Sequence, residues 1–77
     1  RGIAASARGS GITLSPRERE CLLWSAQGKT VDDVASIVGI SAETTRVYIK
    51  RCITKMNASN KTHAVAKAIH LGMVSLN

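Results

Sequence analysis

Residues 30–57 read TVDDVASIVGISAETTRVYIKRCITKMN, and this stretch decides the fold. Its apolar residues recur with a helical period on both sides of a short turn, Gly39-Ile40-Ser41. Gly39 suits the left-handed backbone at the end of a short helix, and Ser41 can cap the longer helix that follows. A short helix, a tight turn and a longer basic helix together predict a helix-turn-helix arrangement.

The longer helix is expected over residues 42–57, and its two faces separate cleanly at about 100° per residue. The face expected in the core carries Thr45, Ile49, Cys52, Ile53 and Met56, with Tyr48 at its edge. The opposite face carries Glu43, Arg46, Val47, Lys50, Arg51 and Thr54. A charged helix face is most often only solvated. This one follows the turn that, in helix-turn-helix proteins, brings the second helix into the major groove of DNA.

The sequence before this stretch predicts another helix. Ser15 can cap it, Pro16 suits its first position, and Glu18 completes a capping box. Leu14, just before the cap, is expected to pack against the first turn. Gly28 supplies the left-handed residue that ends the helix.

The remaining two helices also have recognisable ends. Thr30 caps the short helix of the opening stretch, with Asp33 as a weaker box partner. Asn60 or Ser59 caps a fourth helix, and Gly72 closes it. The sequence therefore predicts an all-α fold, a compact four-helix bundle that contains the helix-turn-helix.

The chain is expected to divide into a flexible linker and one domain. Residues 1–13 are rich in Gly, Ala and Ser and show no periodicity, whereas residues 14–77 carry all four helical patterns. Arg1 and Arg8 in the linker either touch DNA phosphates as an arm or are simply solvated. Because the first residue is not Met, we expect the chain to be a fragment of a larger protein.

The charge of the chain points to an acidic polymer as partner, either nucleic acid or an anionic membrane surface. Eleven Lys and Arg against five Asp and Glu give a net charge of +6. All five acids precede residue 44, so the C-terminal half carries the positive field.

Other classes of function find no support in the sequence. Paired carboxylates and nucleophile–base sets are absent, so we expect no enzyme and no cofactor. Gly28-Lys29-Thr30 lacks the upstream glycine of a P-loop. His63 and His70 complete no metal-ligand spacing with Cys21 and Cys52, which are expected to be small buried hydrophobes. The sequence shows no bilayer-spanning run and no signal peptide, so the expected location is the cytoplasm.

The helix over residues 42–57 supplies four candidates for reading DNA bases: Glu43, Arg46, Val47 and Lys50. Arginine binds guanine O6 and N7, lysine reads guanine or holds a phosphate, and valine suits a thymine methyl. Glu43 accepts from cytosine N4 or orients a neighbouring arginine, and Val47 has the alternative of packing against a neighbouring helix.

Helix N-termini and exposed cations both attract phosphates. The phosphate-contact candidates are Lys29, Thr30, Ser41, Thr44, Arg51, Lys55 and Lys61. For Thr30 and Ser41 the alternative role is capping alone.

The ordered set of motifs resembles the C-terminal DNA-binding domain of LuxR-type regulators over residues 14–74. The matching motifs are Leu14-Ser15-Pro16-Arg17-Glu18, Ala26-x-Gly28, Val34-Ala35, Gly39-Ile40-Ser41, Thr44, Lys55 and Ala64-Val65. Four positions depart from the usual pattern: Thr45, Tyr48, Arg51 and Lys61 stand where Val, His, Asn and Arg are common. The departures leave the fold unaffected and concern the DNA sequence that is preferred.

The resemblance implies a bacterial transcription regulator that binds a dyad-symmetric DNA site as a homodimer. The fourth helix would contribute to the dimer interface, for which the candidates are Lys67, Ala68, Leu71 and Met73; their alternative role, above all for Ala68, is in the core of the same chain.

The resemblance also implies an N-terminal sensor domain, which either binds an acyl-homoserine lactone or is a phosphorylated receiver. Trp24, the Gly28-Lys29-Thr30 run and Arg46-Val47-x-Ile49-Lys50 resemble the quorum-sensing branch. The alternatives are the output domain of a two-component response regulator and a basic module that docks on a membrane or a protein.

Overall fold

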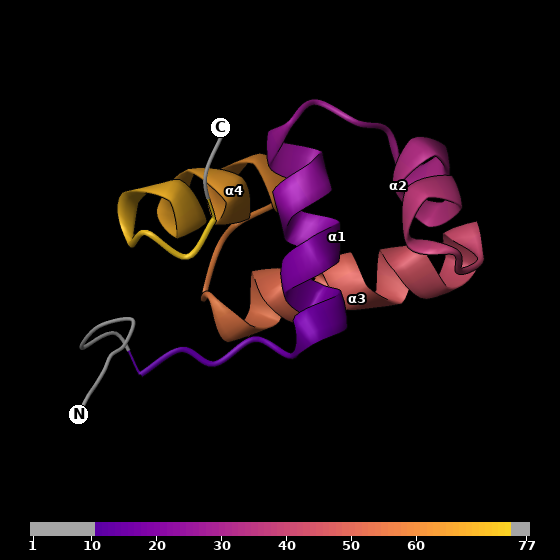
Figure 1. Cartoon of the computed structure of the whole chain (residues 1–77). Coiled ribbons are helices and arrows are strands. Elements are labelled where there is room, and N and C mark those ends of the chain that lie inside the picture. The colour runs from indigo at the N-terminus through magenta and orange to yellow at the C-terminus, as the bar shows by residue number, and fades with distance from the viewer. Residues whose placement is uncertain (1–10, 75–77) are drawn as a thin grey trace.

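The computed structural model describes residues 11–74, which form four α-helices joined by short turns. The helices are α1 (Pro16–Ala26), α2 (Val31–Val38), α3 (Ala42–Lys55) and α4 (Lys61–His70). In Figure 1, α1 crosses α3 at the centre of the molecule, with α2 on one side of α1 and α4 on the other. The all-α helix-turn-helix fold expected from the sequence is confirmed. Most of the expected linker, including Arg1 and Arg8, lies outside the described residues.

Capping boxes begin α1 and α2, as the sequence predicts. The Ser15 hydroxyl accepts from the Glu18 backbone N–H, and the Glu18 carboxylate accepts from the Ser15 backbone N–H at 2.8 Å. Thr30 and Asp33 form the same reciprocal pair, although the shorter aspartate makes a longer bond of 3.4 Å. Each box satisfies two backbone donors that the helix itself leaves without acceptors.

One motif ends all four helices: a backbone N–H bonds to a carbonyl five residues earlier, around a residue with positive φ, which is Gly39 after α2. Gly28 and Gly72 occupy the left-handed position after α1 and α4, as expected. After α3 the position is held by Asn57, with φ 52°. Because Asn57 turns the chain, α3 ends at Lys55 and not at residue 57, so the expected end was two residues too late.

Two groups of buried side chains fill the molecule. The first cluster joins α1, α3 and α4 and contains Leu14, Leu22, Cys52, Met56, Ala64, Ala68 and Val74. The second cluster joins α1, α2 and α3 through Cys21, Val34 and Ile49. Ile12, from the segment expected to be linker, also packs against the first cluster. Both clusters use the inward face of α3, so the core fixes the direction in which its other face points.

Candidate nucleic-acid interface

The face of α3 that lies away from the core is exposed along its whole length. Glu43, Arg46, Val47, Lys50, Arg51 and Thr54 are all exposed. Thr45, Ile49, Cys52 and Met56 are buried on the opposite side, which confirms the separation of faces read from the sequence. Val47 is 44% exposed, so the alternative that it packs against a neighbouring helix does not hold.

An open hollow of about 480 Å³ lies on this outward face. Its lining residues are Val47, Lys50, Arg51, Thr54 and Lys55. The side chains of three cations, one valine and one threonine line the hollow, and its surface is almost wholly apolar because the aliphatic stems of the cations face it. Thr54 was placed on this face by the sequence but was not chosen as a site residue.

The turn between α2 and α3 presents two hydroxyl groups. Ser41 caps α3 by accepting from the Thr44 backbone N–H at 3.0 Å, and its hydroxyl also pairs with the Thr44 hydroxyl at 2.9 Å. One proton suffices for the hydroxyl–hydroxyl bond, so the second hydroxyl proton of the pair remains for another acceptor. Below them Thr45 is buried, and its hydroxyl donates to the Ser41 carbonyl at 2.9 Å.

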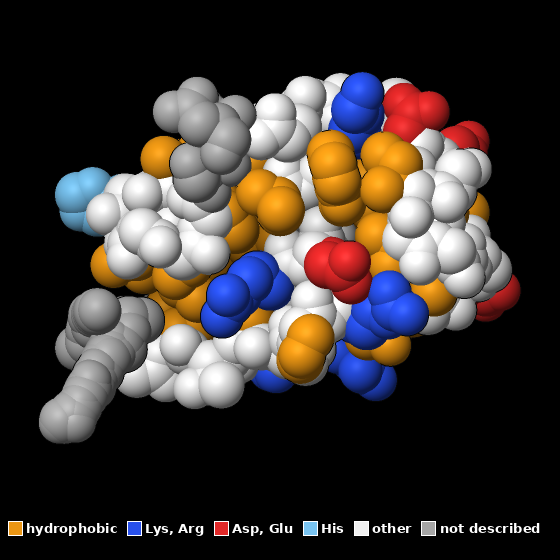
Figure 2. All heavy atoms as spheres, viewed as in Figure 1, with side chains coloured by type: hydrophobic (Ala, Val, Ile, Leu, Met, Phe, Trp, Pro, Cys, Tyr) orange, Lys and Arg blue, Asp and Glu red, His pale blue; other side chains and the backbone are white. Residues whose placement is uncertain are grey.

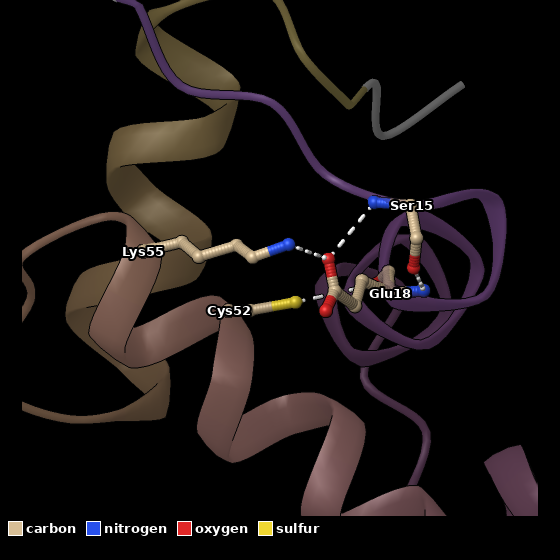
Figure 3. Close-up of polar contacts among 4 residues, drawn as sticks. All are labelled: Ser15, Glu18, Cys52 and Lys55. Carbon is tan, nitrogen blue, oxygen red and sulfur yellow. Dashed lines mark hydrogen bonds and ion pairs between the residues drawn. The ribbon is translucent and has the colours of Figure 1, made fainter.

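A carboxylate from the start of α1 holds the end of α3 (Figure 3). Glu18 Oε1 accepts both from the Ser15 backbone N–H and from Lys55 Nζ, each at 2.8 Å. The Glu18 side chain is 3% exposed and that of Lys55 is 43% exposed. Burial alone would raise the pKa of Glu18, but the hydrogen bonds from Lys55 and Ser15, together with the charge of Lys55, outweigh it and lower the pKa. The carboxylate is therefore ionised near neutral pH. The Lys55 ammonium binds Glu18, and the Lys55 side chain also lines the hollow.

The two cysteines are buried and free, as expected for small hydrophobic residues. The Cys52 thiol donates to the Glu18 backbone carbonyl at 3.3 Å, directly beside the Lys55 ion pair (Figure 3). Burial raises the pKa of Cys52 to about 12, so the thiol stays protonated near neutral pH. Cys52 therefore adds a second contact between α1 and α3.

Arg17 makes a contact that the sequence does not reveal. Its guanidinium donates to the Val38 carbonyl at the end of α2 and pairs with the exposed Glu20. The contact joins the start of α1 to the residue just before the turn.

Acidic side chains are unevenly distributed over the surface. On the face shown in Figure 2 they lie over its centre and its α2 end, whereas α4 carries none.

Of the four candidates for a dimer interface, Ala68 takes the alternative role expected for it, in the core of its own chain. Ala68 is 0% exposed and belongs to the first core cluster, so it offers no surface to a second chain. Lys67 donates to the Met56 carbonyl at 2.9 Å, where its positive charge interacts favourably with the helix dipole at the C-terminal end of α3. Leu71 and Met73 are partly buried against the same cluster.

The exposed face of α4 is formed by residues other than these candidates. Thr62, Ala66 and Ile69 are exposed, and Ile69 is one of three large apolar residues exposed among those described. At about 100° per residue they lie roughly 140–200° from the buried Ala64. Lys67 and Ala68, the two candidates within α4, therefore lie on its core-facing side, opposite this exposed face.

No helix within residues 11–74 is long and apolar enough to cross a membrane. Within the same residues, no three His, Cys, Asp or Glu side chains lie where they could hold a metal ion.

Comparison with known proteins gives consistent matches. The profile of the family described as "Bacterial regulatory proteins, luxR family" matches residues 12–68. The chain is 43% identical over 63 residues to the "HTH-type quorum sensing-dependent transcriptional regulator VjbR" of Brucella ovis, which is 82% of this chain and 24% of that protein. It is also 43% identical over 63 residues to the "HTH-type quorum sensing-dependent transcriptional regulator RpaR" of Rhodopseudomonas palustris, covering 82% and 26% of the two chains.

The fold comparison agrees with the sequence matches. A solved structure titled "Structure of Transcription factor, GerE" has a TM-score of 0.79 and 30% identity, covering 83% of this chain and 96% of that one. The "Transcriptional repressor ThaA" of Burkholderia thailandensis is 42% identical over 57 residues, covering 74% and 24%. The present chain thus spans about a quarter of the length of these curated relatives.

Proposed function

Because the chain belongs to the LuxR family of bacterial regulatory proteins, we propose that it is the DNA-binding output domain of a quorum-sensing transcription regulator. The observation that carries this proposal is the exposed face of α3, which follows a capped turn and lies opposite the core. An α-helix with such a face fits the major groove of B-form DNA.

The base-reading residues lie in the first two and a half turns of α3. Arg46 donates to guanine O6 and N7, and Lys50 reads guanine one turn further along. Val47 contacts a thymine methyl, for which its exposed apolar surface is suited. Glu43 accepts from cytosine N4 or orients Arg46. Thr54 extends this surface toward the end of the helix.

Phosphate contacts surround the base-reading face. The spare hydroxyl proton of the Ser41–Thr44 pair donates to a phosphate at the N-terminus of α3. Lys29 and Thr30 contact a phosphate at the start of α2. Arg51 and Lys61 supply charge from α3 and α4, and Lys61 at the first position of α4 faces an unfavourable helix dipole, which a bound phosphate would relieve.

Lys55 has a smaller part in DNA binding than its charge suggests. Its ammonium already donates to Glu18, and contact with a phosphate would draw it away from that buried carboxylate. We therefore assign Lys55 first to fixing α3 on α1 and only second to the phosphate backbone.

Two copies of the domain bind a dyad-symmetric site, with contacts through the outward face of α4. The uncharged residues Thr62, Ala66 and Ile69 form the centre of this contact, and Leu71 and Met73 lie at its edge. The rest of the protein supplies a sensor domain that binds an acyl-homoserine lactone. In support, VjbR and RpaR are named as quorum sensing-dependent regulators and are about four times as long as the matched region. The regulator works on nucleoid DNA in the cytoplasm, with no catalytic role and no cofactor.

The test is selection of bound duplexes from a random pool, at two salt concentrations, followed by sequencing. Recovery of a motif with two related half-sites is the expected result, and a fluorescence-anisotropy titration then gives its affinity relative to random DNA. Salt-sensitive binding with no enriched motif would contradict the base-reading role of α3. An enriched single half-site would instead contradict the dimer.

A further inference from the structure

Arg51 is exposed, yet its side chain is not simply extended into solvent. Its guanidinium carbon lies 5.8 Å from the centroid of the Tyr48 ring, within the range of cation–π attraction. A guanidinium has five N–H donors around the rim of a flat group. Cation–π attraction involves the positive charge and not the N–H groups, so donors at the rim remain for an anion.

The core holds the Tyr48 side of this contact in place. It is half-buried and packs against the second core cluster, between α1, α2 and α3. An arginine at an exposed helix position otherwise samples many rotamers and loses that freedom when it binds. A ring held by the core orders the guanidinium before the ligand arrives.

We propose that Tyr48 is a positioning residue for DNA binding, whose ring holds the Arg51 guanidinium in the orientation that contacts a phosphate. This inference rests on the proposed function and deepens it. Because phosphates carry no sequence information, Tyr48 acts on affinity for every sequence and leaves the preferred motif unchanged. Arg51 also lines the hollow on α3, so its orientation helps to set the shape of that surface.

The experiment is a double-mutant cycle on the affinity of the whole chain for the selected duplex and for a random duplex. Tyr48→Leu should weaken binding to both by about two- to fivefold. In the Arg51→Ala background, Tyr48→Leu should cause no further loss. Tyr48→Phe is the matched control: it keeps the ring and should bind like the wild type. Thermal unfolding of every variant reports whether the fold is retained.

A substitution of the other partner in the contact, Arg51, tests the proposal if Tyr48→Leu does not fold. Arg51→Lys retains the charge without the flat group, and it should lose as much affinity as Tyr48→Leu. Wild-type affinity in Arg51→Lys, an equal loss from Tyr48→Leu with and without Arg51, or a loss in Tyr48→Phe would each overturn the positioning role. In those cases the wild type still binds DNA. A wild type that binds neither duplex would overturn the proposed function together with this inference.

Discussion

Replacement of Glu18 by alanine should destabilise the domain more than any other loss of a single carboxylate. Glu18 Oε1 holds the Ser15 backbone N–H and the Lys55 ammonium at the same time. Loss of a charge-assisted bond to the backbone costs about 1.5–3 kcal/mol. Lys55 is 43% exposed, so it regains water and the full cost of an orphaned buried charge does not arise.

The expected loss is therefore about 2–3 kcal/mol for Glu18→Ala, which lowers the melting temperature by roughly 10–20 °C in a domain of this size. Glu18→Gln keeps a neutral acceptor and should lose about 1 kcal/mol. The matched control is Glu20→Ala on the same helix, whose carboxylate is 48% exposed and pairs with Arg17. An exposed pair of this kind is worth less than about 1 kcal/mol.

The pH dependence of the unfolding free energy tests whether the charge of Glu18 causes this loss of stability. Its pKa is lower in the folded chain than its ordinary value of 4.5, so its ionised form stabilises the fold. That stabilisation is complete above pH 4.5 and disappears as the pH falls through the lower folded pKa. The difference in unfolding free energy between wild type and Glu18→Gln, from urea titrations, should shrink over this window. A difference that is constant down to pH 3, or a Glu18→Ala loss equal to that of Glu20→Ala, would refute the reasoning.

Three further predictions concern DNA binding, a helix end and association. Arg46→Ala and Lys50→Ala should each weaken binding to the selected duplex by on the order of 1–3 kcal/mol and relax its sequence preference; equal losses on random DNA would exclude base reading. Asn57→Ala should destabilise by about 1 kcal/mol in urea titrations, because its backbone is left-handed, whereas Asn57→Gly should be at least as stable as wild type. Ile69→Glu should abolish cooperative binding to the two half-sites with an unchanged melting temperature, and retained cooperativity would exclude the α4 interface.

Local signals in the sequence were sufficient for most of the fold. Capping boxes and glycine ends depend on residues three to five positions apart, so Ser15, Glu18 and Gly39 could be assigned without knowledge of the tertiary structure. The one misplaced end has a local reason too. Asn57 was taken as the last helical residue, although asparagine is the residue other than glycine that most readily adopts the left-handed turn.

Contacts between helices could not be derived in the same way. Glu18 and Lys55 are 37 positions apart, and nothing in their spacing indicates that α1 and α3 cross at that point. The sequence also left open whether Ala68 lies in the core or in a dimer interface, and the structure buries it. Ala64, Ala66 and Ala68 place similar small residues on both faces, so the hydrophobic period is weak and exposure alone distinguishes Ala66 from its neighbours.

The two cations at the end of α3 illustrate how one helix serves both the core and the surface. Lys55 binds the buried carboxylate of Glu18 and so holds α3 against α1. Its ammonium is therefore only partly available to DNA. Arg51, one turn earlier, lies 5.8 Å from the centroid of the Tyr48 ring and has donors available for an anion. We therefore expect loss of the first cation to reduce mainly stability and loss of the second to reduce mainly affinity. Such a division would let a domain with a small core present a charged helix to DNA in one fixed orientation.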